Sequence, residues 1–462
     1  MLLEALQKYC PDATCMHMPG HMRSKDYAYL NSLAAAWDIT EIDGFDDLHN
    51  PSGILLRSME AAAKLWGSEY SRYLVNGSTC GILACVYALG KNGGRAVVAR
   101  NAHKSLYHAL EITGVEPTFV LSGFDRQTGA CTDISPESIE KALDDTPDAR
   151  FVFLTSPTYE GVISDVERIC EIAHRRNVPV IVDEAHGAHL DLTDDFRHGA
   201  VKAGADIVIQ SLHKTLLSLT QTAIMHISGK RVIIEEINHA LDIFETSSPS
   251  YLLMASIDGC VETLTGEKEK ILHSWRTNID EFRAQADKLK RIRLWKPQNA
   301  FAFDESKLVI HHSSLSGVQL MRLLRERFSV ELEAAYPRYA VAMTGAGTSR
   351  EALNKLLSAL IEIDKEEIHG NMHAPDALPP VPERVYSVKD ALGMKKKMVK
   401  ADEAAGRVSA EYAWAYPPGV AVIAPGERIG REQLEALKEF VLSGVNTVTT
   451  FSEEGFLTVI DN

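Results

Sequence analysis

The sequence has little cysteine and no long apolar run, and both absences narrow the class of protein. Its seven cysteines are scattered, odd in number and form no C-x-x-C pair, which favours reduced thiols in a cytosol. No segment approaches the ~18 consecutive apolar residues that span a bilayer. The first residues also lack the apolar stretch of a signal peptide. We therefore expect a cytoplasmic protein with no membrane partner.

Basic charge is in the minority. The chain has 48 Lys and Arg against 63 Asp and Glu, so its net charge is −15. An acidic chain disfavours nucleic acid and anionic membranes as partners and is compatible with a small cationic substrate. With 462 residues, of which 45% are hydrophobic and 24% charged, the composition is that of a globular protein with two to four domains.

Several catalytic signatures are also missing. Asp183-Glu184-Ala185-His186 matches a nucleoside triphosphatase box, but no G-x-x-x-x-G-K-[ST] loop precedes it. Ser211-x-x-Lys214 is not followed by the Ser-Asp-Asn or Lys-Thr-Gly of serine β-lactamases. His186 and His189 have no third ligand at metal-binding spacing. Hydrolase and dinucleotide motifs, G-x-S-x-G and G-x-G-x-x-G, do not occur in the required context.

Two predicted strand ends carry the main chemical signal. The β-branched run 178–182 ends at Asp183, and the apolar run 206–210 leads to Lys214. In open α/β sheets, ligands bind outside the carboxyl ends of the strands. Pyridoxal 5'-phosphate (PLP) needs a lysine for its Schiff base and an acid that keeps its ring nitrogen protonated. For these two motifs alone, a loop-capping acid and a solvated lysine remain the alternative.

Two earlier strand ends fit the same cofactor. The strand 73–75 is followed by Asn76-Gly-Ser-Thr-Cys80 and a helix, an arrangement that can hold a phosphate at the positive helix end. A plain helix cap explains it equally well in isolation. His103 follows the strand 95–99 and opens the next helix. Its imidazole can stack on the PLP ring or be satisfied by the helix N-terminus.

The order of elements predicts an α/β protein. Alternating strands and helices predict a large domain with a mainly parallel sheet flanked by helices. The strand 223–227 is expected to run away from the site, and Lys389–Lys400 to form a basic helical run. We expect an N-terminal segment (1–50), a large domain (51–250) and a small α/β domain (251–372). A Pro-rich linker (373–382) and a C-terminal α+β domain (383–462) should follow.

Together these motifs resemble the Orn/Lys/Arg decarboxylase family, bacterial PLP enzymes of the aspartate aminotransferase fold (fold type I), whose large domain has a mostly parallel seven-stranded sheet. The matching segments follow the family's order along the chain. They are His17-x-Pro-Gly-His21, Glu41–His49, Asn76-Gly-Ser-Thr79, Asn101-Ala-His-Lys104, Pro157-Thr-Tyr159, Asp183-Glu-Ala-His186, Ser211-x-His-Lys214 and Tyr416-Pro-Pro-Gly419.

The resemblance implies roles for particular residues. Lys214 would bind the cofactor covalently, Asp183 would pair with the ring nitrogen, His103 would stack on the ring and His186 would lie beside it. The phosphate and its surroundings would involve Ser78, Thr79, Cys80, Ser211 and His213. Glu411 would approach the distal cation of the substrate, and the acidic loop of Asp43 and Asp46, reaching across a dimer, is a rival.

The implied reaction is decarboxylation of a basic L-amino acid, with arginine favoured over lysine or ornithine, feeding polyamine synthesis. The implied assembly is a homodimer or higher homo-oligomer. Met22 stands where the family usually has lysine, and an N-terminal receiver-like domain is missing, which favours a short biosynthetic member over one that forms large rings. Alternatives are another PLP reaction such as transamination, and a PLP-binding regulator, although residues 1–50 show no basic helix-turn-helix pattern.

Overall fold

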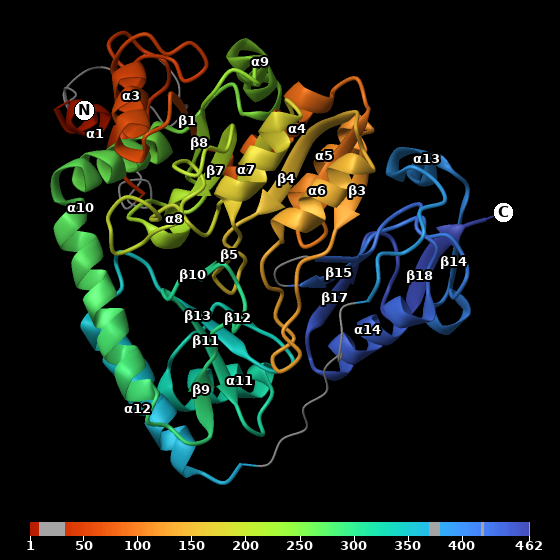
Figure 1. Cartoon of the computed structure of the whole chain (residues 1–462). Coiled ribbons are helices and arrows are strands. Elements are labelled where there is room, and N and C mark those ends of the chain that lie inside the picture. The colour runs from red at the N-terminus through yellow and green to blue at the C-terminus, as the bar shows by residue number, and fades with distance from the viewer. Residues whose placement is uncertain (9–32, 369–378, 417–419, 462) are drawn as a thin grey trace. The chain divides into compact units, whose positions relative to one another are not determined.

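A computed structural model describes residues 1–8, 33–368, 379–416 and 420–461 (Figure 1). The chain divides into two compact units. The first unit comprises residues 1–89 and 179–273, and the second comprises residues 90–178 and 274–462. Each unit combines segments that the predicted domain limits separate, so those limits stay a prediction.

The largest sheet has seven strands in the order β1-β8-β7-β6-β4-β2-β3. They are β1 (Tyr70–Leu74), β2 (Arg95–Ala99), β3 (Glu116–Val120), β4 (Ala149–Thr155), β6 (Val180–Asp183), β7 (Ile207–Ser211) and β8 (Ala223–Ile227). β6 is parallel to β7, and β2 is parallel to β3 and β4. β8 is antiparallel to both β1 and β7, so it runs away from the Lys214 end as predicted. The predicted α/β class is confirmed.

The strands that lead to the predicted site are buried along their whole length. Every residue of β6 and β7 is buried, and most of them are β-branched. Such side chains pack well on a sheet that is covered on both faces. The strand ends are therefore held firmly where the polar residues begin.

Five helices precede or connect these strands. They are α3 (Ile54–Trp66), α4 (Gly77–Gly90), α5 (Lys104–Thr113), α6 (Pro136–Asp144) and α7 (Val166–Arg175). Three of them, α5, α6 and α7, begin at a side-chain cap. The Ser135 hydroxyl accepts the N–H of Ser138 at the start of α6, and Asp165 accepts the N–H of Arg168 at the start of α7. Each side-chain oxygen satisfies a backbone donor that the helix leaves unpaired.

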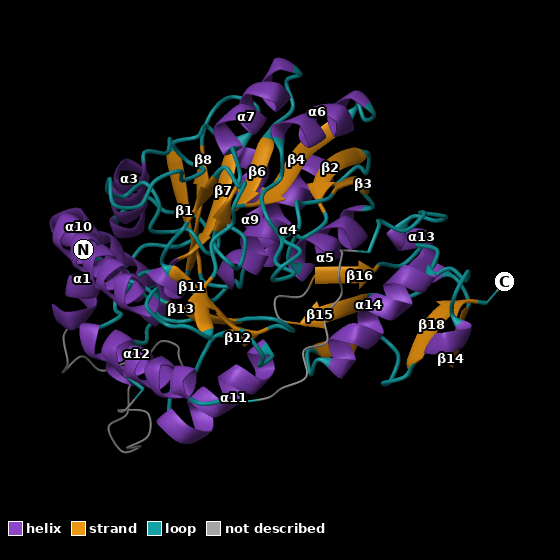
Figure 2. Ribbon diagram, turned by 60° about the horizontal axis from the view of Figure 1, so that its bottom comes forward, coloured by secondary structure: helices purple, strands orange, loops and turns teal. Residues whose placement is uncertain are grey.

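The first unit also contains α1 (Leu2–Lys8), the short helix η1 (Ala35–Trp37), α8 (Leu212–Thr215), α9 (Ile234–Phe244) and the first part of α10 (Tyr251–Ala286). Figure 2 shows β1, β8, β7 and β6 side by side in this unit. A buried polar chain crosses them. Glu184 accepts a hydrogen bond from the Gln210 amide at 2.7 Å, Gln210 contacts His226 at 3.1 Å, and His226 contacts Ser71 at 2.8 Å.

Glu184 predicts a pH dependence of stability. Burial raises the pKa of this carboxyl from its ordinary value near 4.5 to about 8. The stability that its neutral form contributes is full below its unfolded pKa and is lost as pH rises through its folded pKa. From pH 5 to pH 9, we expect the free energy of unfolding of the native chain to fall. In Glu184→Gln this fall should be smaller, by on the order of a few kcal/mol.

Chemical denaturation at both pH values measures this difference. Glu167→Gln, at an exposed position of α7, is the matched control and should follow the native pH dependence. Equal losses for native protein and Glu184→Gln would contradict the prediction.

The second unit includes a four-stranded sheet of order β12-β13-β11-β9. Its strands are β9 (Ile292–Leu294), β11 (Lys307–His312), β12 (Ala334–Ala335) and β13 (Ala340–Met343), and its core also uses α11 (Gly317–Phe328) and α12 (Arg350–Lys365). A separate short ladder pairs β5 (Val162–Ile163) with β10 (Ala302–Phe303).

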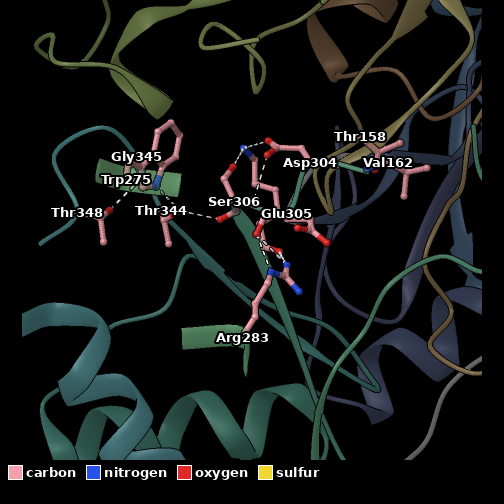
Figure 3. A network of polar contacts seen from close by, with 11 residues as sticks. Thr158, Val162, Trp275, Arg283, Asp304, Glu305, Ser306, Thr344, Gly345 and Thr348 are labelled. Carbon is pink, nitrogen blue, oxygen red and sulfur yellow. Dashed lines mark hydrogen bonds and ion pairs between the residues drawn. The ribbon is translucent and has the colours of Figure 1, made fainter. Parts of the chain in front are cut away.

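A polar network holds the strand β11 in this sheet. Figure 3 shows the Arg283 guanidinium directed at Glu305, whose carbonyl accepts two of its N–H groups at 3.0 and 2.8 Å. Lys307 and Asp304 form an ion pair of 2.9 Å with both side chains fully buried. Because a buried charge without a partner is costly, each of these two side chains stabilises the other in its buried position.

The C-terminal part of the second unit is an α+β arrangement. It contains α13 (Val388–Gly393), β14 (Lys396–Lys400), η2 (Ala401–Glu403), β15 (Ala413–Tyr416), β16 (Val420–Ile423), α14 (Arg431–Leu442), β17 (Asn446–Thr449) and β18 (Phe456–Ile460). β14 pairs antiparallel with β18. The prediction that Lys389–Lys400 is one helical run was wrong, because the second half of this run is a strand whose Val399 is buried.

Among the helices that the structure describes, none has the length and apolar character that crossing a membrane requires.

Candidate active site

Lys214 and Asp183 come from the ends of two paired strands. Asp183 is the last residue of β6, and β7 ends at Ser211, after which the single helical turn α8 carries Lys214. β6 and β7 are parallel, with Asp183 opposite Ile209. The amine Nζ of Lys214 lies 2.9 Å from Nε2 of His186. Three predicted site residues therefore lie within the first unit, at the carboxyl end of its strands.

The environment of Asp183 suits a cationic partner. Its side chain is buried, and its carboxylate accepts the N–H of Ala185 at 3.1 Å. Burial raises the pKa of this carboxyl, and the positive charge of Lys214 opposes that rise. A protonated ring nitrogen beside Asp183 would stabilise its ionised form further. The residues present therefore fit the pyridine ring of PLP.

The turn between β1 and α4 supplies hydroxyl groups and helix N–H groups. Gly77 has φ = +75°, a conformation that glycine adopts without strain. The Ser78 hydroxyl lies 2.7 Å from that of Ser211, so the two predicted phosphate segments meet here. Thr79 is exposed, whereas Cys80 is buried and burial raises the pKa of its thiol. Cys80 thus packs as a neutral thiol, and Ser78, Thr79 and Ser211 are the hydroxyls that could hold a phosphate.

His213 has a constrained ring. Its Nδ1 donates to the carbonyl oxygen of Thr222 at 2.8 Å. Burial lowers the pKa of this imidazole, and Lys214 lowers it further. A neutral ring that donates through Nδ1 has no proton at Nε2. Holding a phosphate through Nε2 would therefore require the protonated ring, which a nearby anion would favour.

His103 caps the helix α5. Its Nδ1 accepts the N–H of Ser105 at 3.3 Å and lies 2.8 Å from the Ser105 hydroxyl. The ring is half-buried. His103 thus makes the contact with the helix N-terminus that the sequence offered as one of two alternatives. Stacking of its ring on PLP stays a prediction.

Arg100, three residues before His103, has a partner that the sequence analysis missed. Its guanidinium donates to both carboxylate oxygens of Glu427 at 2.6 and 2.9 Å, and both side chains are buried. Its carbonyl accepts the Tyr107 hydroxyl at 2.6 Å. An arginine directly after a buried strand and a glutamate in Pro425-Gly-Glu427 were the available signals, but sequence alone does not pair residues 327 positions apart.

Glu411 is engaged by hydrogen-bond donors from its own part of the chain. Its side chain is fully buried, and its oxygens accept the N–H groups of Phe451, Ser452 and Thr458 together with the Ser452 hydroxyl, at 2.5–3.0 Å. These donors satisfy the carboxylate and shape the turn before β18. Contact between Glu411 and the substrate's distal cation, which the resemblance implies, stays a prediction.

Asp46 has a similar structural role. Its carboxylate accepts the N–H groups of Asp47, Ser52, Gly53 and Leu55 at 2.7–3.0 Å. These bonds lower the pKa of Asp46, although burial opposes them. They fold the acidic loop onto the start of α3. Asp43, the other residue of this loop that is predicted to bind the substrate, is exposed to solvent.

Replacing Glu411 tests whether its task is structural or lies in substrate recognition. We expect Glu411→Ala to lower the free energy of unfolding by about 3 kcal/mol, since hydrogen bonds to charged groups contribute about 1.5–3 kcal/mol each. The order of rates with arginine, lysine and ornithine should stay as in the native chain. Glu403→Ala, at an exposed position of the same part of the chain, is the control. A changed substrate order with unchanged stability would support the role in substrate recognition.

Two predicted motifs lie outside the described residues. These are His17–His21 with Met22, and the segment Pro417–Gly419 that follows β15.

Comparisons with known proteins give a consistent result. The model of the Orn/Lys/Arg decarboxylase major domain matches residues 2–321, and that of the C-terminal domain matches residues 377–451. An arginine decarboxylase of Bacillus subtilis is 31% identical over 433 residues, which cover 90% of this chain and 88% of that protein. The protein YaaO of the same organism, which is uncharacterized, is 34% identical and covers 92% of this chain and 90% of its own length.

Solved structures with the same fold agree. The lysine decarboxylase LdcF of Francisella novicida has a TM-score of 0.80 at 19% identity, covering 100% of this chain and 80% of its own. The alanine–glyoxylate aminotransferase of Nostoc has a TM-score of 0.56 at 12% identity, covering 68% of this chain and 90% of its own. Both likenesses concern the fold, and they confirm the predicted fold type I.

Proposed function

Because this chain belongs to the Orn/Lys/Arg decarboxylase family, whose members are amino-acid decarboxylases, we propose that it decarboxylates a basic L-amino acid with PLP as its cofactor. The observation that carries the proposal is the meeting of Lys214, Asp183 and His186 at the ends of β6 and β7. Arginine is the favoured substrate, followed by lysine or ornithine, because the relatives that cover most of this chain include arginine decarboxylases.

The side chains at these strand ends have separable tasks. When bound, PLP supplies a ring that accepts the electrons left by departing carbon dioxide. Asp183 would hold the proton at the ring nitrogen, because burial disfavours its ionised carboxylate unless a positive charge lies beside it. Lys214 carries the amine that binds the cofactor, and its Nζ can return a proton to the substrate's α-carbon. His186, 2.9 Å from that amine, orients it and can share its proton.

The substrate's distal cation needs an acidic partner, since a buried cation without one is destabilised. Asp43 is the candidate that remains after Glu411 and Asp46 are assigned to backbone donors. We also propose that the product amine enters polyamine synthesis in the cytoplasm, and that the chain works as a homodimer or a higher homo-oligomer.

Product analysis tests the reaction. The purified chain is incubated with PLP and, separately, with arginine, lysine and ornithine, while amine and carbon dioxide are measured. We expect both products in equal amounts, with arginine fastest. A keto acid in place of the amine would favour transamination, a second candidate because the fold also resembles the Nostoc aminotransferase. Cofactor binding without product from any of the three would refute the substrate class.

A further inference from the structure

Val75 is the buried residue immediately before the phosphate turn, and side chains from two other segments bind its backbone. The β1–β8 ladder extends to Leu74 opposite Ala223, so Val75 lies one residue beyond it. Its N–H donates to Oε1 of Glu245 at 2.6 Å, and its carbonyl accepts from the Gln221 amide. Because Val75 is buried away from water, these bonds satisfy groups that would otherwise be costly.

Glu245 is placed by the end of the helix α9. It is the C-cap residue, and its own N–H donates to the carbonyl of Leu241 at 2.8 Å. The preceding residue, Phe244, packs edge-to-face on Tyr87 of α4 with ring centres 5.5 Å apart. The C-terminus of α9 therefore contacts both the helix α4, through Tyr87, and the residue Val75 that precedes the turn into α4.

His49 holds this helix end from the other side. Its Nδ1 lies 2.9 Å from the carboxylate of Asp242, and its Nε2 lies 2.9 Å from the carbonyl of Thr246. These contacts lie on either side of Glu245 in the sequence. They give a structural task to His49, the last residue of the acidic segment 41–49. The proposed reaction does not otherwise use His49.

We propose that Glu245, held in place by His49, is a positioning residue for the phosphate of the cofactor. Its carboxylate fixes Val75, so that the turn 76–79 presents the Ser78 hydroxyl and the first N–H groups of α4 to the phosphate. This inference rests on the proposed function and deepens it. Burial raises the pKa of Glu245 to about 7, and the hydrogen bond from Val75 opposes the rise. A carboxyl oxygen accepts this bond in either protonation state.

Comparing PLP with pyridoxal, which lacks the phosphate, tests the proposal on the full chain after removal of its cofactor. Absorbance titration gives the dissociation constant of each compound. For Glu245→Ala we expect PLP to bind about tenfold more weakly, the effect of losing one hydrogen bond to a buried group. Pyridoxal should bind with unchanged affinity, because it makes no use of the phosphate turn.

The conservative variant and a matched control separate positioning from general damage. Glu245→Gln keeps an oxygen for the Val75 N–H and should retain most of the preference for PLP over pyridoxal. Glu235→Ala, at an exposed position in the first turn of α9, should leave both constants unchanged. Gln221→Ala removes the hydrogen bond to the Val75 carbonyl and should also lower the preference for PLP over pyridoxal. This variant replaces Glu245→Ala in the test if Glu245→Ala does not fold.

Each result has a defined meaning. An unchanged ratio of the two constants in Glu245→Ala, or in Gln221→Ala if that variant replaces it, would overturn the inference. An equal loss in Glu245→Gln and Glu245→Ala would also overturn it, since the charge and not the hydrogen bond would then be responsible. If the native chain forms no adduct with PLP, the proposed function fails instead.

Discussion

Lys214→Ala is expected to abolish decarboxylation, with a fall in kcat on the order of 10⁴-fold, the upper range for a positioned proton-transfer group. The loss has two causes, since the same amine binds the cofactor and lies where it can move a proton. His186 would lose the contact that its Nε2 makes with Nζ at 2.9 Å. The visible absorbance of lysine-bound PLP should disappear in this variant.

Two variants make this test specific. Lys214→Arg keeps a positive charge near Asp183 but lacks a primary amine, so it should retain stability and show no activity. Lys230→Ala, at an exposed turn after β8, should match the native rate. Native absorbance in Lys214→Ala would mean that another lysine binds the cofactor, and the assignment of Lys214 would then be wrong.

The elements that position Lys214 could be predicted from the sequence because their signals are local. A run of β-branched residues predicts a buried strand, and a polar residue after it marks the strand end. The strand 223–227 was confirmed with the predicted limits. The basic run 389–400 was misassigned because its many charges predicted a solvated helix. Instead, its second half pairs with β18 as the strand β14, and its Val399 is buried.

The partners of the site residues could not be predicted in this way. Glu411 was selected from its matching position in the family it resembles, but its hydrogen-bond donors come from residues 451–458, about which that match gives no information. Glu245 and Arg100 were not selected, since their tasks depend on contacts with Val75 and Glu427 far along the chain. Sequence patterns thus identify residue types suited to a reaction, whereas the structure decides which of them are already engaged by backbone donors.

Asp183→Asn should lower kcat far more than it weakens substrate binding, by about 10²–10³-fold, as for other groups that stabilise charge in a transition state. The amide keeps the size of the carboxylate but not its charge, so it cannot hold a proton at the ring nitrogen. Steady-state rates with arginine give kcat and KM separately. Asp194→Asn is the control, because Asp194 is 98% exposed on a loop of the same unit.

Stability supplies an independent measure for the same variant. Because burial raises the pKa of Asp183, its ionised form is destabilised in the chain without cofactor. Asp183→Asn should therefore unfold at a temperature no lower than the native chain when PLP is absent, and should gain less than the native chain when PLP is added. PLP methylated at its ring nitrogen carries a permanent positive charge and should restore part of the lost kcat, since it needs no acid to keep that charge. Unchanged kcat in Asp183→Asn would show that the proton at the ring nitrogen does not depend on this carboxylate.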